Sequence, residues 1–90
     1  MAQLFKTTGE VIEITPQNGK KFSLKEAQEL VGGYVELVPL KHRKQLICNE
    51  EGAILDMPYN EKATEVLREN YWPHAQRLFG DVILCMTKEF

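Results

Sequence analysis

Residues 82–86 read Val-Ile-Leu-Cys-Met, an uninterrupted apolar run. A strand with one face in water alternates apolar and polar residues, whereas a strand covered on both faces does not. The run therefore predicts a central strand with protein packed on either side of it. A chain of 90 residues has room for one such core, so we predict a single domain over residues 1–90.

Two further strands are predicted close to the start of the chain. Residues 3–6 and 10–15 flank Thr7-Thr8-Gly9, and the second of these runs alternates charged and apolar residues. Together they predict a hairpin. Residues 34–38 are rich in aromatic and β-branched residues and predict another strand, which ends at Pro39.

A second hairpin is predicted in the middle of the chain. Residues 45–48 return to sheet-like composition after an exposed basic connection, and residues 53–56 are again mostly apolar. Between them, residues 49–52 begin with Asn and end with Gly, which tight turns favour at these positions. We therefore expect residues 45–48 and 53–56 to pair.

Two helices are predicted from their capping signals. Ser23 and Glu26 have the spacing of a capping box, and Gly32-Gly33 can end the helix that follows. Asn60 is a favourable N-cap for a second helix over residues 61–70. The apolar face of the first helix consists of Leu24, Ala27, Leu30 and Val31.

The order of these elements predicts an α+β fold. A single small domain is expected, in which a mixed or mainly antiparallel sheet packs against two helices. Residues 71–79 contain Pro73, which interrupts a helix, so we expect a turn or a short helix there.

Charge and cysteine content exclude several classes of protein. Eleven Lys and Arg against thirteen Asp and Glu give a net charge of -2. This charge excludes a dominant electrostatic affinity for nucleic acid or anionic lipid, so we do not expect the protein to bind duplex nucleic acid. Cys48 and Cys85 lie within apolar runs, so we interpret them as reduced core residues of a cytoplasmic protein. Neither a signal peptide nor a membrane span is expected.

Four short motifs occur in a definite order along the chain. They are LVGGYVE at residues 30–36, ICNEEG at residues 47–52, Pro58-x-Asn60, and GDV at residues 80–82. In order and spacing they resemble a family of small phage and mobile-element proteins that is known only as a domain of unknown function. The resemblance implies a small intracellular bacterial or phage protein and carries no established activity.

The polar members of these motifs are the first candidate ligand site. Five of them lie near predicted strand or helix ends, where loops from different elements converge. They are Glu36, Asn49, Glu50, Asn60 and Asp81. Carboxylates and amides suit the recognition of hydroxyl groups or base edges in a nucleoside-like ligand. Turn geometry and helix capping explain several of the same residues, so both interpretations stay open.

Two other segments are candidates for binding. Lys41, Arg43 and Lys44 form a basic connection that can hold phosphate groups, and its alternative is a solvated loop. Tyr71, Trp72 and His74 offer anchors of the kind enriched at protein interfaces, or they cover the core of a small domain. Self-association is expected because small chains often gain core by forming homo-oligomers.

No catalytic or metal-binding arrangement is evident in the sequence. His42 and His74 lack ligands at the spacing of zinc motifs, and no phosphate-binding loop or nucleophile triad is present, so neither metal nor cofactor is expected. We therefore favour a non-enzymatic binding module that sequesters a nucleotide-like ligand or engages a host protein. Anti-defence action is one form that this binding could take. The alternatives are a small nucleotide-directed enzyme using Glu36, Glu50 or Asp81 as general base, and a nucleic-acid-binding regulator using the basic connection.

Overall fold

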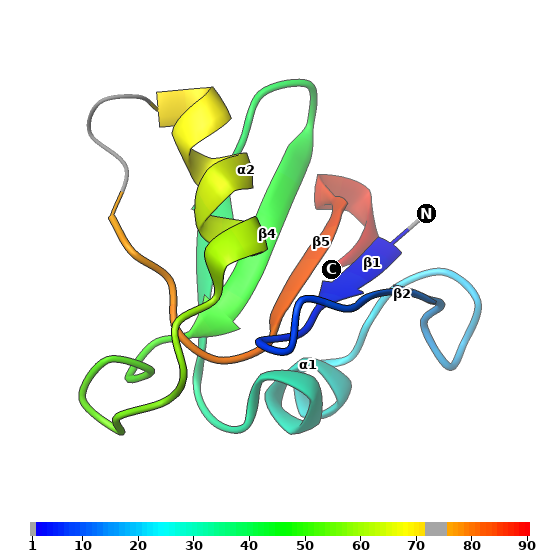
Figure 1. The fold of residues 1–90 in the computed structure, drawn as a ribbon. Coiled ribbons are helices and arrows are strands. Elements are labelled where there is room, and N and C mark those ends of the chain that lie inside the picture. The colour runs from blue at the N-terminus through cyan, green and yellow to red at the C-terminus, as the bar shows by residue number, and fades with distance from the viewer. Residues whose placement is uncertain (1, 72–75) are drawn as a thin grey trace.

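The computed structural model describes residues 2–71 and 76–90 (Figure 1). Strands and helices follow one another along the chain in an order close to the predicted one. The elements are β1 Ala2–Phe5, β2 Val11–Ile14, α1 Leu24–Val31, β3 Val35–Pro39, β4 Lys44–Asn49, α2 Glu61–Tyr71, β5 Val82–Met86 and a 3-10 helix, η1, Thr87–Glu89.

The strands form one 5-stranded sheet in the order β2-β1-β5-β4-β3. Every neighbouring pair is antiparallel, and β5 lies in the middle between β1 and β4. The predicted α+β fold and the central position of residues 82–86 are thus confirmed. The position of β5 explains its composition, because both of its faces are covered.

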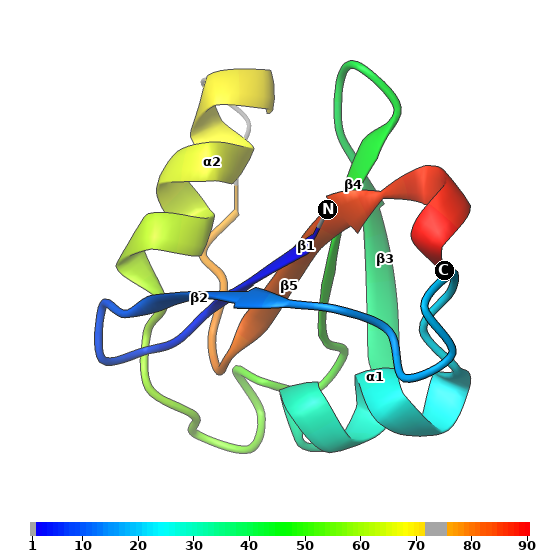
Figure 2. The ribbon, with the colours of Figure 1, turned by 90° about the vertical axis from the view of Figure 1, so that its right-hand side faces the viewer.

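The two helices pack on opposite faces of the sheet (Figure 2). On the α1 side, Ile83 of β5 lies in one core with Val31. On the α2 side, Val82 lies in a second core with Leu67. Successive side chains of a strand point to opposite faces, so β5 supplies alternate residues to the two cores.

Helix α1 begins and ends as predicted. The hydroxyl of Ser23 accepts a hydrogen bond from the Glu26 N–H at 3.1 Å, and the Glu26 carboxylate accepts one from the Ser23 N–H at 3.0 Å. Gly32 ends the helix with a φ of 83°. Leu24 differs from the predicted apolar face, because it is the first helical residue and stays exposed at 56%.

Residues 53–56 were predicted to form a strand, and that prediction is wrong. They form consecutive turns, in which Leu55 N–H donates to the Glu51 carbonyl and Met57 N–H to that of Gly52. The physical reason lies in the sheet, where β4 already pairs with β3 on one side and with β5 on the other. No edge of β4 remains for these residues, and Ile54 is consequently 82% exposed.

The cysteines are free and buried, as expected. Cys48 lies in the core beneath α2, whereas Cys85 lies in the core beneath α1, so the sheet separates them. Among the described residues, no helix has the length and apolar character needed to cross a membrane. Predictions for Trp72 and His74 fall outside the described residues.

Candidate functional site

The four sequence motifs meet at one end of the sheet, where β4 ends and β5 begins. Hydrogen bonds join the first motif to the second and the third to the fourth, and the Met57 N–H, next to the third motif, donates to the Gly52 carbonyl of the second. The Asn49 side chain donates to the Val31 carbonyl at 3.2 Å, the Asn60 side chain donates to the Gly80 carbonyl at 2.8 Å, and Gly80 N–H donates to the Pro58 carbonyl at 2.8 Å. Segments that are far apart in the sequence therefore form one connected end of the domain.

Asn60 forms hydrogen bonds with three backbone segments at this end of the sheet. Its side-chain amide donates to the carbonyls of Phe5 and Gly80, both at 2.8 Å, and its Oδ1 accepts from the Ala63 N–H at 3.1 Å. The last bond is the predicted N-cap of α2. Asn60 is only 1% exposed, so its polar atoms serve the backbone of its own chain.

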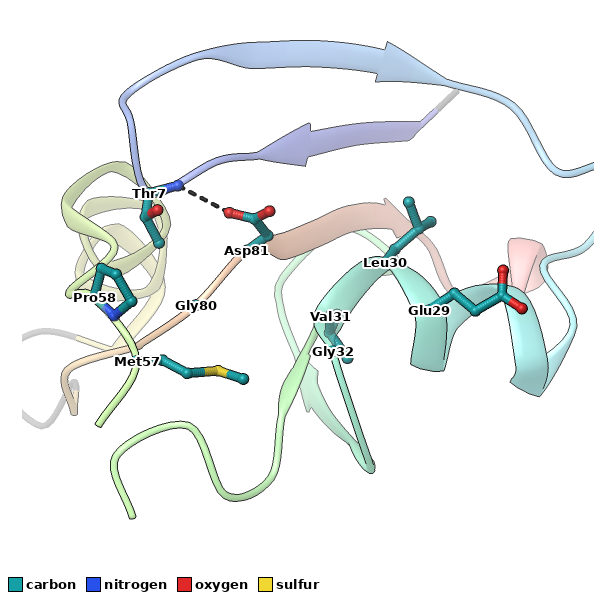
Figure 3. A pocket seen from close by; sticks show the side chains of 9 residues that line it. All are labelled: Thr7, Glu29, Leu30, Val31, Gly32, Met57, Pro58, Gly80 and Asp81. Carbon is teal, nitrogen blue, oxygen red and sulfur yellow. Dashed lines mark hydrogen bonds between the residues drawn. The ribbon is translucent and has the colours of Figure 1, made fainter. Parts of the chain in front are cut away.

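An open hollow of about 350 Å³ lies at this end of the sheet (Figure 3). We call it the Asp81 hollow. The residues that line it include Thr7, Glu29, Leu30, Met57, Pro58 and Asp81. Its size lies at the lower end of the range for small-molecule sites.

Asp81 is the one predicted ligand residue that lines this hollow. Its Oδ1 accepts a hydrogen bond from the backbone N–H of Thr7 at 3.0 Å, across 74 residues of sequence. Figure 3 shows the Asp81 carboxylate facing the turn that carries Thr7. The bond fixes the orientation of a half-buried carboxylate, which can accept further hydrogen bonds from a ligand.

Met57 forms the apolar floor of the hollow. Its side chain extends between Gly32 and Gly80 in Figure 3. A Cβ added to Gly80 would lie 2.8 Å from the Met57 sulfur, and one added to Gly32 would lie 3.4 Å from its Cε. Both glycines also have positive φ angles, so this floor depends on the absence of their side chains.

The charge of the hollow is negative. Asp81 contributes a carboxylate, and the C-terminal end of α1, which carries no basic residue in its last turn, lies in the same wall. The Glu29 carboxylate points away from Asp81 and Met57 in Figure 3. The end of a helix where carbonyls are unpaired carries partial negative charge. The hollow consequently favours hydrogen-bond donors and cations over anions.

Three other predicted ligand residues lie together in a smaller hollow. Glu36, Asn49 and Glu50 line a polar hollow of about 180 Å³, together with Arg77. Asn49 is buried and its Oδ1 accepts from the Glu51 N–H, so its side chain is occupied by the chain itself.

The basic residues lie at the opposite end of the sheet. Lys41 and Arg43 are in the turn between β3 and β4, and Lys44 begins β4, whereas Asn49 ends it. In Figure 1 this turn is at the top and α1 at the bottom. Lys44 lines a separate hollow of about 230 Å³ on the sheet. The basic predicted ligand residues thus lie at one end of β4, and the acidic and amide ones lie at the other end. A small ligand cannot contact both groups at once.

Tyr71 is the predicted interface residue that the structure describes. It ends α2, is 41% exposed, and donates a hydrogen bond from its hydroxyl to the Pro39 carbonyl. This bond connects the last turn of α2 to the end of β3.

The two thiols are chemically protected. Burial, together with the nearby Glu36 charge, raises the pKa of Cys48 to about 12. Burial also raises the pKa of Cys85. Both therefore stay protonated at neutral pH, and a protonated thiol is a poor nucleophile. Among the described residues, no group of three His, Cys, Asp or Glu side chains is placed to hold a metal ion.

A comparison with protein families identifies one match. The family described as a domain of unknown function (DUF3846) matches residues 3–90. The chain belongs to this family. Searches of curated proteins and of solved structures found no match to it. The predicted membership of a family of unknown function is therefore confirmed.

Thr7 and Met57 of this DUF3846 chain are not among the site residues predicted from sequence. Thr7 is a turn residue whose relevant group is its backbone N–H, which any residue except proline would supply. Met57 resembles an ordinary core residue. The available signals were the glycines at positions 32 and 80, which mark where another side chain comes close.

Proposed function

We propose that this protein is a non-enzymatic binding module that holds a small, donor-rich ligand of the nucleoside type in the Asp81 hollow. The observation that carries the proposal is the Asp81 carboxylate, which the Thr7 N–H holds in place at a hollow that Leu30, Met57 and Pro58 also line. A carboxylate of this kind accepts hydrogen bonds from neighbouring hydroxyl groups, such as those of a ribose, or from base N–H groups.

The remaining walls suit the flat face of a base. Leu30, Met57 and Pro58 present apolar surface opposite the carboxylate. Ligand sites typically combine such apolar walls with a few placed polar groups, which fix the orientation of the ligand. Met57 is an adaptable contact for an aromatic ring because its sulfur is polarisable.

The charges favour an unphosphorylated ligand. Glu29 and Asp81 line the hollow, whereas Lys41, Arg43 and Lys44 lie at the other end of the sheet. A phosphate bound with the base in the hollow would approach the Asp81 carboxylate, and no cationic side chain is among the described residues that line the hollow, so phosphate binding is unfavourable there. We therefore narrow the nucleotide-like ligand expected from sequence to a nucleoside-like one.

Binding without turnover is the favoured activity. The pKa values of both thiols are raised by burial, which keeps them unreactive. The proposed setting is the bacterial cytoplasm, where free thiols persist, in a protein of phage or mobile-element origin. Sequestering a nucleoside-like signal would be one form of anti-defence action.

The test is calorimetric titration of the common ribonucleosides and of their 5′-monophosphates. We expect at least one nucleoside to bind, its monophosphate to bind more weakly, and Asp81→Asn to weaken nucleoside binding about tenfold through loss of a charge-assisted hydrogen bond. Asn keeps an oxygen for the Thr7 N–H, so the variant should fold.

Glu50→Gln, in the neighbouring polar hollow, is the matched control and should bind normally. Absence of binding by every nucleoside, or unchanged binding by Asp81→Asn, would overturn the proposal. Conversion of a nucleoside to product would overturn its non-enzymatic part.

A further inference from the structure

The strand β2 forms one edge of the sheet and pairs, in the described part of the chain, with β1 alone. The Lys6 N–H donates to the Glu10 carbonyl, so the backbone groups of residue 10 face β1. Backbone groups alternate in direction along a strand, which places those of Ile12 and Ile14 on the same inner side. The N–H and C=O groups of Val11 and Glu13 consequently face outward. Figure 2 shows β2 crossing the front of the sheet.

The opposite edge is less suited to pairing. There the Glu50 N–H donates to the Tyr34 carbonyl, so Val35, Leu37 and Pro39 are the outward-facing positions of β3. Pro39 has no N–H, and proline at an edge is a known obstacle to the addition of a strand. Strand β2 contains no proline between Val11 and Ile14. It is therefore the open edge of this sheet.

An apolar groove runs beside β2. It has a volume of about 340 Å³ and lies between β2 and α1, with Ile14, Phe22 and Leu30 in its walls. Ile12 points to the same face of the sheet as Ile14 and is 38% exposed. A strand added next to β2 would direct every second side chain to the face of the sheet on which α1 and this groove lie.

The groove carries negative charge. Its charged lining residues are Glu26 and Glu29 of α1, and Glu13 lies on the open strand itself. Glu26 is held as a carboxylate by the N–H groups of Ser23 and Gln17. Because alternate side chains of a strand point to opposite faces, Lys or Arg between the apolar residues of a segment would lie on the face of Glu13, and Glu26 and Glu29 would attract these cations at longer range.

We propose that β2 and the groove beside α1 bind an extended, basic segment of another protein by strand addition. Main-chain hydrogen bonds to Val11 and Glu13 would supply affinity, and the groove would select apolar side chains. A second copy of this chain is disfavoured as the occupant, because it would bring Glu13 and its neighbours against the same carboxylates. The groove shares Glu29 and Leu30 with the Asp81 hollow, but the proposal does not rest on the ligand proposed there.

The probe is a fluorescein-labelled, terminally blocked peptide that alternates Lys and Val, with binding measured by anisotropy. A Glu-Val peptide tests charge, and a Lys-Val peptide with N-methyl groups on alternate amides tests backbone pairing. We expect the plain Lys-Val peptide to bind, and both others to bind at least about fivefold more weakly. Equal binding by the N-methylated peptide would overturn the proposal, and this result needs no variant of the protein.

Two variants locate the site. Val11→Pro removes an outward N–H without removing a bond to β1, and Glu29→Lys reverses a charge in the groove. Each should weaken binding of the Lys-Val peptide about fivefold or more. Glu65→Lys, an exposed change on α2, is the matched charge control and should have a smaller effect. Normal binding by Val11→Pro, or a dimer of the wild-type chain that Val11→Pro dissociates, would overturn the proposal.

Discussion

The side-chain amide of Asn60 donates a hydrogen bond of 2.8 Å to the carbonyl of Gly80. The same nitrogen donates to the carbonyl of Phe5, so one amide joins the ends of three chain segments: β1, the start of α2 and the approach to β5. The Asp81 hollow is built on this connection, because Asp81 and Pro58 lie next to the bonded residues.

Replacing Asn60 with Ala should destabilise the protein strongly. The change removes a helix cap and leaves two buried carbonyls without their donor, so we expect a loss of about 2–4 kcal/mol in the free energy of unfolding. Urea denaturation measures this loss. Asn70→Ala is the matched control, since Asn70 makes similar bonds at a more exposed site and should cost about 1 kcal/mol. Equal losses for the two variants would contradict the role given to Asn60.

Gly80→Ala should cost more than Gly9→Ala. Both glycines have positive φ angles, of 82° and 95°, but only a Cβ at position 80 would meet another side chain, the Met57 sulfur at 2.8 Å. We expect Gly9→Ala to lose about 1 kcal/mol and Gly80→Ala at least about 1 kcal/mol more.

Thermal or urea unfolding of the double variant Gly80→Ala with Met57→Ala separates the two causes. A positive coupling, in which Met57→Ala costs less stability when it is combined with Gly80→Ala than when it is made in the wild-type chain, is the expected sign. Additive losses would show that Met57 does not crowd position 80.

Glu26 should make the stability of α1 depend on pH in the acid range. The N–H groups of Ser23 and then of Gln17 bind its carboxylate and hold the pKa of Glu26 below its usual value. Because the folded-state pKa is the lower one, the stabilisation is complete above the ordinary carboxylate pKa and is lost as the pH falls through the lowered value. The free energy of unfolding, measured across this pH range, should depend more steeply on pH for wild type than for Glu26→Gln. Equal pH dependence of the free energy of unfolding in wild type and Glu26→Gln would contradict the role given to the Glu26 carboxylate.

Cys48 and Cys85 should resist thiol reagents in the native protein. Both are buried, and the pKa of Cys48 is raised to about 12 by burial and by Glu36. Titration with Ellman's reagent at about pH 8 should therefore show rapid reaction of both thiols in urea and slow reaction without it. Fast reaction of either thiol in the native protein would show that the corresponding core opens readily.

Local signals were sufficient for most of the fold. The capping residues Ser23 and Asn60 located both helices, and the apolar run at residues 82–86 located the central strand, because each feature depends on neighbours in the sequence. Residues 53–56 were assigned wrongly for the opposite reason. Their composition suits a strand, but β4 pairs with β5, a partner more than thirty residues later, and no local pattern reveals that pairing.

The candidate site was harder to predict than the fold. Asp81 was found because it precedes a buried strand, where polar side chains become accessible. Its partner Thr7 is 74 residues away and contributes its backbone N–H. Because nearly every residue type carries this group, the sequence does not mark position 7. Asn60 was both a predicted cap and a predicted ligand residue, and the structure shows its amide fully engaged with the backbone.

The most direct test of the proposed binding site is a ¹H–¹⁵N correlation spectrum recorded while each common ribonucleoside is added to the protein. If a nucleoside binds in the Asp81 hollow, the amide signals of Thr7, Gly32, Gly80 and Asp81, which line it, should shift saturably, with little change at Lys41 and Arg43 at the other end of the sheet. Shifts that gather at Lys41 and Arg43 instead, or that fail to saturate anywhere, would contradict the proposed binding site.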